Sequence, residues 1–166
     1  MLVQAVAVVR APASPAQSLG EVRKGAVEAP SEESEEGAMK VCRAGEAEGR
    51  RGAKERFTGA VWLHELLRVP APNGVNAFLV YFEPEARTAW HSHPEGQVLY
   101  VVSGKGRIKK SDASGEEEFE IGPGDLIYCP PNEKHWHGAE GHAAMVHLAV
   151  NLVGSDKETA WGEKVP

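Results

Sequence analysis

Two pairs of histidines have the spacing of metal ligands. His91 and His93 stand two residues apart, and His135 and His137 repeat this spacing further along the chain. Side chains two apart on a β-strand lie on the same face, so each pair can present two imidazoles to one ion. Gln97, at the start of the next apolar run, adds an amide oxygen. Imidazole binds several divalent transition metals, so these residues predict a transition-metal site without choosing the metal.

Another histidine, His147, lies in a segment with strand-like alternation. Apolar side chains occupy every second position, namely Val146, Leu148 and Val150. His147, Ala149 and Asn151 therefore share the opposite face. We predict that this face lines an inward pocket. A solvent-facing edge strand is the alternative.

Short apolar segments separated by turn residues predict the elements that position these side chains. Residues 122–125 read Gly-Pro-Gly-Asp, a strong turn signal. We expect strands at 77–82, 97–102, 106–110, 116–121, 126–129, 135–139 and 145–151. No segment has a convincing helical period, so the pattern indicates an all-β sandwich or barrel.

The beginning of the chain has a different composition. All aromatic residues lie at or after Phe57, and all seven histidines lie at or after His64. Residues 29–37 are polar and acidic, and such a stretch cannot bury enough apolar surface to offset the entropy of ordering it. We predict a disordered extension over 1–38, with Met39 as a candidate translation start, and a single domain over 39–166.

Composition limits the possible partners and compartments. The chain has 166 residues and a net charge of −6, which argues against a nucleic-acid partner. Its two cysteines cannot form a disulfide framework, which favours a reducing, cytoplasmic compartment. No apolar run approaches the roughly 20 residues that span a bilayer, so we expect no membrane partner.

Residues 77–151 resemble a cupin, the small jelly-roll barrel also described as a double-stranded β-helix. The first cupin motif reads His91-x-His93-x3-Gln97-x6-Gly104, and the second reads Gly124-Asp125-x4-Pro130-x4-His135. The sequence departs from the family pattern at four positions. Glu85 and Asn132 replace glycines, Ala139 replaces a closing asparagine, and Gln97 replaces the usual glutamate ligand.

The resemblance implies roles for individual residues. It implies that His91, His93, Gln97 and His135 bind the metal. Within cupins, the sequences around both motifs are similar to the manganese-dependent hydroxynitrile lyases. That similarity implies His147 as the acid/base and Thr88 as a pocket hydroxyl near the substrate. We expect His137, Trp90 and Asn151 either to contact the metal ligands from behind without binding the ion or to line the pocket rim.

We therefore expect a divalent-metal-dependent enzyme acting on a small organic hydroxyl or carbonyl compound. Lyase-like cleavage of a hydroxynitrile is the concrete version, with Mn as the expected metal and Fe, Ni or Zn as alternatives. An Fe- or Ni-dependent dioxygenase and a non-enzymatic ligand-binding or sensor protein are the other possibilities. By resemblance, we also expect a homodimer or homotetramer.

Overall fold

A computed structural model describes residues 39–43 and 45–165, and the extension expected at 1–38 lies outside these residues. The described chain is built from strands and loops. In order these are β1 (Gly49–Arg51), β2 (Phe57–Thr58), β3 (Val61–Val69), β4 (Gly74–Phe82), β5 (Arg87–Thr88), β6 (His91–Ser92), β7 (Gln97–Gly104), β8 (Gly106–Asp112), β9 (Gly115–Ile121), β10 (Leu126–Cys129), β11 (Lys134–Ala139), β12 (Met145–Val153) and β13 (Ala160–Trp161). Within this part of the chain, no helix has the length and apolar character to span a bilayer.

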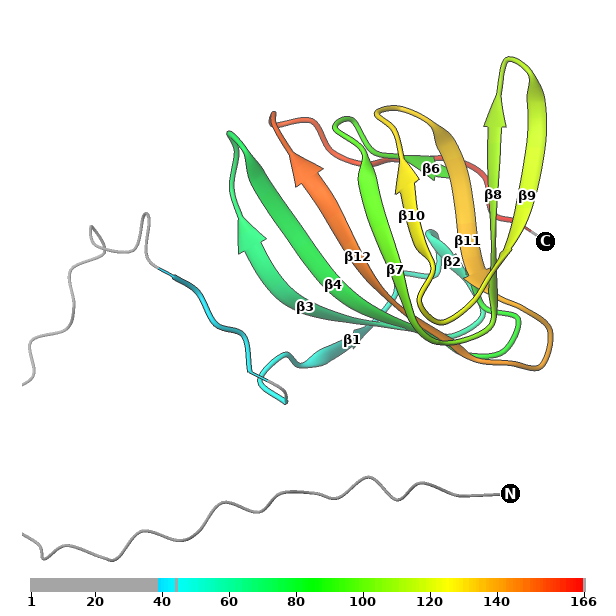
Figure 1. Ribbon diagram of the computed structural model, residues 1–166, viewed down its shortest axis with the longest axis horizontal. Helices are drawn as coiled ribbons and strands as arrows, with labels where there is room; N and C mark the ends of the chain where they lie inside the picture. The colour runs from blue at the N-terminus through cyan, green and yellow to red at the C-terminus, as the bar shows by residue number, and fades with distance from the viewer. Residues whose placement is uncertain (1–38, 44, 166) are drawn as a thin grey trace, which may run out of the picture. The chain divides into compact units, whose positions relative to one another are not determined.

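Two antiparallel sheets curl toward each other to form the barrel (Figure 1). The first sheet has the order β1-β3-β4-β12-β7-β10. The second has the order β13-β6-β11-β5-β2, and β8 pairs with the other edge of β11 and with β9. This architecture confirms the expected all-β jelly-roll class.

The core fills the space between the sheets with large apolar side chains. Phe82, Leu99, Val101 and Met145 are fully buried there. Two further residues of β12, His147 and Ala149, also point inward and are buried. Alternation along the strand thus directs polar side chains into the barrel, as expected for this segment.

The β8–β9 hairpin extends beyond the rest of the barrel in Figure 1. Its acidic run on β9 faces the basic residues of β8. Lys109 Nζ lies 2.6 Å from Glu116 Oε2, and Arg107 Nη1 lies 3.0 Å from Glu118 Oε1. Such exposed pairs contribute little stability individually, so the run acts mainly as a solvated strand face.

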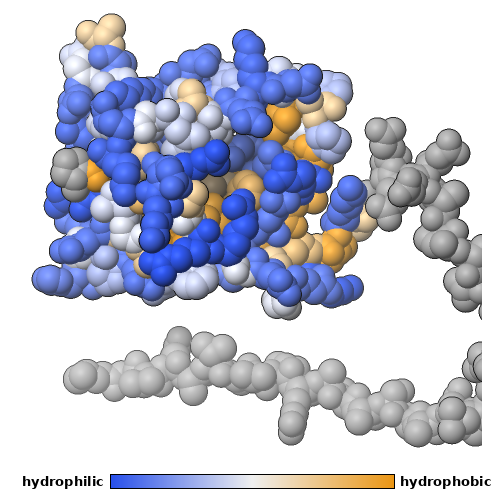
Figure 2. Space-filling model, turned by 180° about the vertical axis from the view of Figure 1, so that it is seen from behind, coloured by the Kyte–Doolittle hydropathy of each residue, from blue (hydrophilic) through white to orange (hydrophobic). Residues whose placement is uncertain are grey.

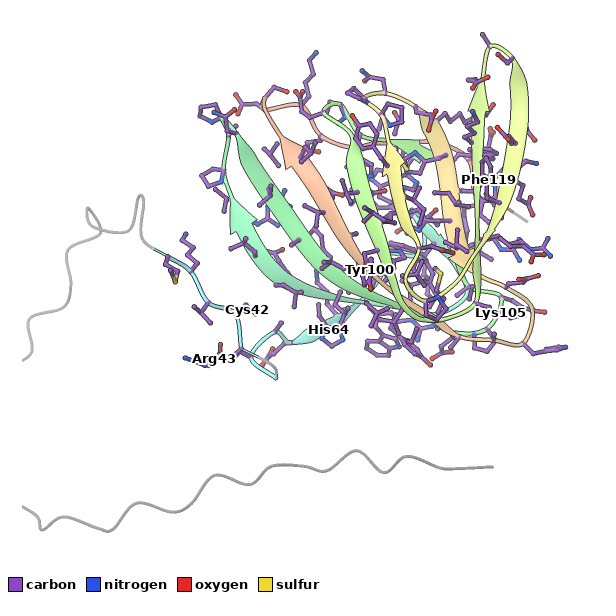
Figure 3. All side chains as sticks on the ribbon, in the orientation of Figure 1. Cys42, Arg43, His64, Tyr100, Lys105 and Phe119 are labelled. Carbon is purple, nitrogen blue, oxygen red and sulfur yellow. The ribbon has the colours of Figure 1, made fainter. Side chains whose placement is uncertain are left out.

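Apolar side chains also occupy the outer face of the first sheet. Tyr100 on β7, labelled in Figure 3, pairs in register with Leu126 on β10. Tyr100 is 44% exposed and Leu126 is 70% exposed, and Tyr128 beyond them is 59% exposed. On the opposite side of the molecule, hydrophobic surface lies between strongly hydrophilic residues (Figure 2).

Candidate metal centre

The two histidine pairs meet because β6 and β11 are neighbours. The register places His135 opposite His91, and their ring centroids are 4.4 Å apart. β6 ends at Ser92, so His93 lies just beyond the strand, with its ring 5.1 Å from that of His91 and 5.8 Å from that of His135. Gln97 enters from β7 of the other sheet, so both sheets contribute donors.

Backbone carbonyls fix the tautomers of two of these rings. His91 Nδ1 lies 2.9 Å from the Ala89 carbonyl, and His135 Nδ1 lies 2.9 Å from the Glu133 carbonyl. A carbonyl oxygen only accepts, so each Nδ1 carries the hydrogen and donates it. Each Nε2 therefore keeps a free lone pair. A ring held in this way through its second nitrogen is the usual arrangement of a metal-ligating histidine.

The contact between Gln97 and His135 indicates that a cation belongs between them. Gln97 Nε2 donates to Asn151 Oδ1 at 2.8 Å, which turns Gln97 Oε1 toward the cluster. That oxygen lies 3.2 Å from His135 Nε2. Both atoms are acceptors, so their lone pairs face each other and repel. A bound cation removes the repulsion, and the residues present therefore fit a divalent metal.

Two histidines are placed to supply the third imidazole. His93 Nδ1 lies 3.1 Å from Thr159 Oγ1, and its Nε2 is buried without a partner among the described residues. His137 also joins the cluster, since ligand atoms of His91, His135 and His137 all lie within 4.8 Å of one another. His137, which was expected behind the ligands or at the pocket rim, thus lies among the donor rings and also lines the cavity.

Burial keeps the histidine cluster uncharged. It is the main cause that lowers the pKa of His91, His93, His135, His137 and His147. The pKa of His93 and that of His147 fall to about 4. The rings are therefore neutral at pH 7, with their lone pairs available for a metal. For His147 this pKa is lower than the near-neutral value expected of a proton shuttle, because the ring is completely buried.

A second pair of imidazoles lies beside the metal donors. His147 Nε2 is 3.2 Å from His137 Nδ1, so the two rings share a hydrogen bond. His147 Nδ1 and His137 Nε2 remain buried with no partner in the described part of the chain. Thr88 Oγ1 accepts a hydrogen bond from the His137 backbone N–H at 3.1 Å, which leaves the hydroxyl hydrogen of Thr88 free to donate.

These side chains open onto a cavity of about 430 Å³. Its polar floor includes Thr88, His91, His93, Gln97, His137, His147 and Asn151. Its walls are apolar, with Leu63, Phe78, Val80, Phe82 and Trp161 among the lining residues. This volume is typical of pockets that enclose a small organic molecule, with few polar groups to orient it.

Trp90 was expected behind the metal ligands or at the pocket rim, and the cavity lining does not include it. Alternation along the chain turns Trp90 away from His91, and its ring packs edge-on against Trp136, 6.5 Å between centroids. The two tryptophans and Val165 form a small apolar cluster of their own.

The C-terminal residues contribute two contacts that the sequence did not reveal. The Trp161 ring stacks on His91 at 4.8 Å between centroids, and Thr159 contacts His93. The pairing of β13 with β6 brings both residues to the site. Nothing in the local sequence of 154–166 marks them, because their role depends on this long-range pairing.

Comparison with known proteins agrees with this geometry. The cupin domain family matches residues 78–151. The chain is 42% identical over 127 residues to an (R)-mandelonitrile lyase from Granulicella tundricola, covering 76% of this chain and 95% of that protein. It is 31% identical over 80 residues to an acireductone dioxygenase from Exiguobacterium sibiricum, covering 48% of this chain and 41% of that one.

A solved structure shares the fold as well. The crystal structure of a cupin-like protein from Thermotoga maritima superposes with a TM-score of 0.62 at 34% sequence identity. The match covers 71% of this chain and 87% of the other. Taken with the two cupin motifs and the jelly-roll barrel, these matches show that the chain belongs to the cupin superfamily.

Proposed function

We propose that this cupin is a metal-dependent enzyme that reversibly cleaves a small α-hydroxynitrile into a carbonyl compound and hydrogen cyanide. The observation that carries the proposal is the uncharged donor cluster opening onto a cavity beside the His137–His147 pair. The relative named (R)-mandelonitrile lyase supports the choice of reaction. The match covers 95% of the length of that protein.

The proposed metal ligands are His91, His93, Gln97 and His135, with Mn(II) as the metal. All four donors are neutral, so none of them offsets the charge of a divalent ion. When bound there, the ion would act as a Lewis acid that polarises a substrate oxygen, and the neutral donor set strengthens this effect.

Side chains of the protein transfer the proton during the reaction. In the cleavage direction, the neutral His147 ring accepts the proton of the substrate hydroxyl. The carbon–carbon bond to the nitrile then breaks, its electron pair leaves with cyanide, and the hydroxyl carbon becomes a carbonyl. The imidazolium returns its proton to cyanide, so protons balance over the cycle. Thr88 donates its free hydroxyl hydrogen to the substrate oxygen, and His137 orients His147 through their shared hydrogen bond.

Mandelonitrile cleavage tests the proposal. Benzaldehyde release is followed by absorbance with chelator-treated protein, before and after Mn(II) is restored. We expect activity only with the metal and a loss of about 100-fold or more in His147→Ala, the usual range for a general base. The exposed His142 provides the matched control, and His142→Ala should keep full activity. Metal-independent turnover, or full activity in His147→Ala, would refute the mechanism.

The acireductone dioxygenase relative favours a second candidate function, oxygen-dependent cleavage of an enolic substrate. That match covers less than half of either chain, so we place this reaction second. Oxygen consumption by the Fe(II)- or Ni(II)-loaded protein with an acireductone or a catechol separates the two reactions. Hydroxynitrile cleavage consumes no oxygen.

A further inference from the structure

The cavity has a strongly basic mouth in a chain that is acidic overall. Four of its lining residues are cationic, Arg50, Arg56, Arg68 and Lys157, and one, Glu158, is anionic. The whole chain carries a net charge of −6. A concentration of positive charge around one concave site, against the net charge of the molecule, focuses the field there and attracts anions.

The strand register aligns one of these cations with the proposed base. Arg50 on β1 is opposite Leu63, Leu63 is opposite Val80, and Val80 is opposite His147. Residues directly opposite each other point to the same face of a sheet, so all four face the cavity. The row spans three strand spacings, about 14 Å between the backbones of Arg50 and His147. Two apolar side chains separate the cation from the histidine.

A second row of paired residues also leads from an arginine to a residue of the proposed metal site. Arg68 on β3 is opposite Asn76, Asn76 is opposite Asn151, and Asn151 is opposite Gln97. Arg68 already forms an ion pair with Glu65, with Nη2 and Oε2 2.7 Å apart. Its charge is therefore largely matched within the protein.

The charge of Arg50 helps to lower the pKa of Glu65, but no ion pair joins these two residues in the described part of the chain. Among the described residues, Arg50, Arg56 and Lys157 form no salt bridge. The Arg56 guanidinium lies over the Trp161 ring, 5.2 Å from its centroid, which holds it at the cavity wall. A cation–π contact of this kind leaves the guanidinium N–H groups free to donate.

We infer that the substrate carries an anionic group, a carboxylate or a phosphate, at the end opposite its reacting oxygen. Arg50, Arg56 and Lys157 bind the anion at the mouth, the apolar walls enclose the middle of the molecule, and its oxygen reaches the histidine floor. The inference rests on the proposed function, because it names the class of hydroxyl or carbonyl compound that the same cavity accepts. A neutral aromatic hydroxynitrile would leave the basic mouth unused.

Three aldehydes of similar shape test the inference by calorimetry. The anionic probes are 4-carboxybenzaldehyde and 4-formylphenyl phosphate, and the neutral probe is 4-formylbenzamide. Each is titrated into metal-loaded and chelator-treated protein. We expect the anions to bind about tenfold more tightly than the amide, because charge-assisted hydrogen bonds are roughly twice as strong as neutral ones. Roughly 0.5 M salt should narrow this difference.

Charge-neutral variants locate the anion site. In the double variant Arg50→Gln/Lys157→Gln, the anionic probes should lose about tenfold in affinity while the amide is unaffected. Lys105→Gln is the matched control, because Lys105 lies in the turn between β7 and β8, outside the cavity lining (Figure 3). Its affinities should equal those of the unmodified protein. The anion that binds more tightly identifies the natural group.

Two results would overturn the inference: equal affinity for the amide and both anions, or equal losses in the double variant and in Lys105→Gln. Failure of the proposed reaction is distinguishable from either. Anion preference in a protein that cleaves no hydroxynitrile, charged or neutral, would refute the reaction and retain the anion site. Hydroxynitrile cleavage without any anion preference would refute the anion site alone.

Discussion

Gln97 sets the balance between metal retention and Lewis acidity in the proposed centre. Its amide oxygen is neutral, whereas a carboxylate in the same place would cancel part of the charge of a divalent ion. We predict that Gln97→Glu binds Mn(II) at least about tenfold more tightly, since opposite charges attract strongly at a buried site. Its hydroxynitrile cleavage should fall, because the ion becomes a weaker Lewis acid. A metal titration with a fluorescent competitor measures the affinity, and an unchanged dissociation constant would contradict this role of Gln97.

The buried histidines predict how stability depends on pH. In the folded chain the pKa of His93 and that of His147 are about 4, below the ordinary value of 6.5. Between pH 6.5 and 4 the unfolded chain therefore binds protons that the folded chain does not. Stability rises with pH in this window and is lost as pH falls through it. Thermal unfolding of chelator-treated protein should show a midpoint that decreases steadily from pH 6.5 to pH 4, and a flat profile would contradict the burial of neutral rings.

At the scale of turns, two family glycines are replaced by residues that keep the glycine conformation. Asn132 has φ of 63° and Glu85 also has φ of 63°. Asparagine tolerates this left-handed region, whereas glutamate is strained there. We predict that Glu85→Gly raises the free energy of unfolding by about 1 kcal/mol in chemical denaturation. Glu83→Gly, in the same loop without a positive φ, should lower it, and equal effects of the two changes would contradict the strain.

The seven strands expected from the sequence correspond to β4 and β7 to β12, with ends that differ by up to three residues. The expected ranges were 77–82, 97–102, 106–110, 116–121, 126–129, 135–139 and 145–151. Their apolar runs and flanking turn residues are local signals, so the sequence was sufficient. β3 is absent from these expected ranges. Its segment Val61–Val69 carries no clean alternation, and a register shift between Glu65 and Leu67 interrupts its pairing.

The short strands β1, β2, β5, β6 and β13 were not predictable in this way. Each has two or three residues, and all except β1, which pairs with the nearby β3, depend on a partner far away in the sequence. The histidine spacings predicted which residues gather at the site. They did not predict Trp161 and Thr159, which only the β6–β13 pairing brings there.

At the scale of the molecule, the outer face of the first sheet is left apolar. Tyr100, Leu126 and Tyr128 lie on adjacent strands and are all exposed. Contiguous exposed apolar surface of this kind commonly marks an interface. We predict a homo-oligomer that buries this face, in line with the expected dimer or tetramer.

Light scattering after size exclusion measures the assembly. Leu126→Glu should yield monomers, because it places a charge in the centre of the interface. Phe119→Glu, an equally drastic change on the β8–β9 hairpin, should leave the oligomer intact. A monomeric unmodified protein, or the same dissociation in both variants, would contradict an interface at this face.

The proposed metal centre needs a closed barrel, because His91 and His135 come from one sheet and Gln97 from the other. The most direct test of the account is therefore the metal content of purified protein after saturation with Mn(II) and desalting, measured by elemental analysis. We predict about one ion per chain in the unmodified protein and in His142→Ala, and almost none in His135→Ala or His93→Ala. His137→Ala should retain the ion, which separates His93 from His137 as the third imidazole. Equal metal content in the unmodified protein and in His135→Ala would contradict the proposed centre.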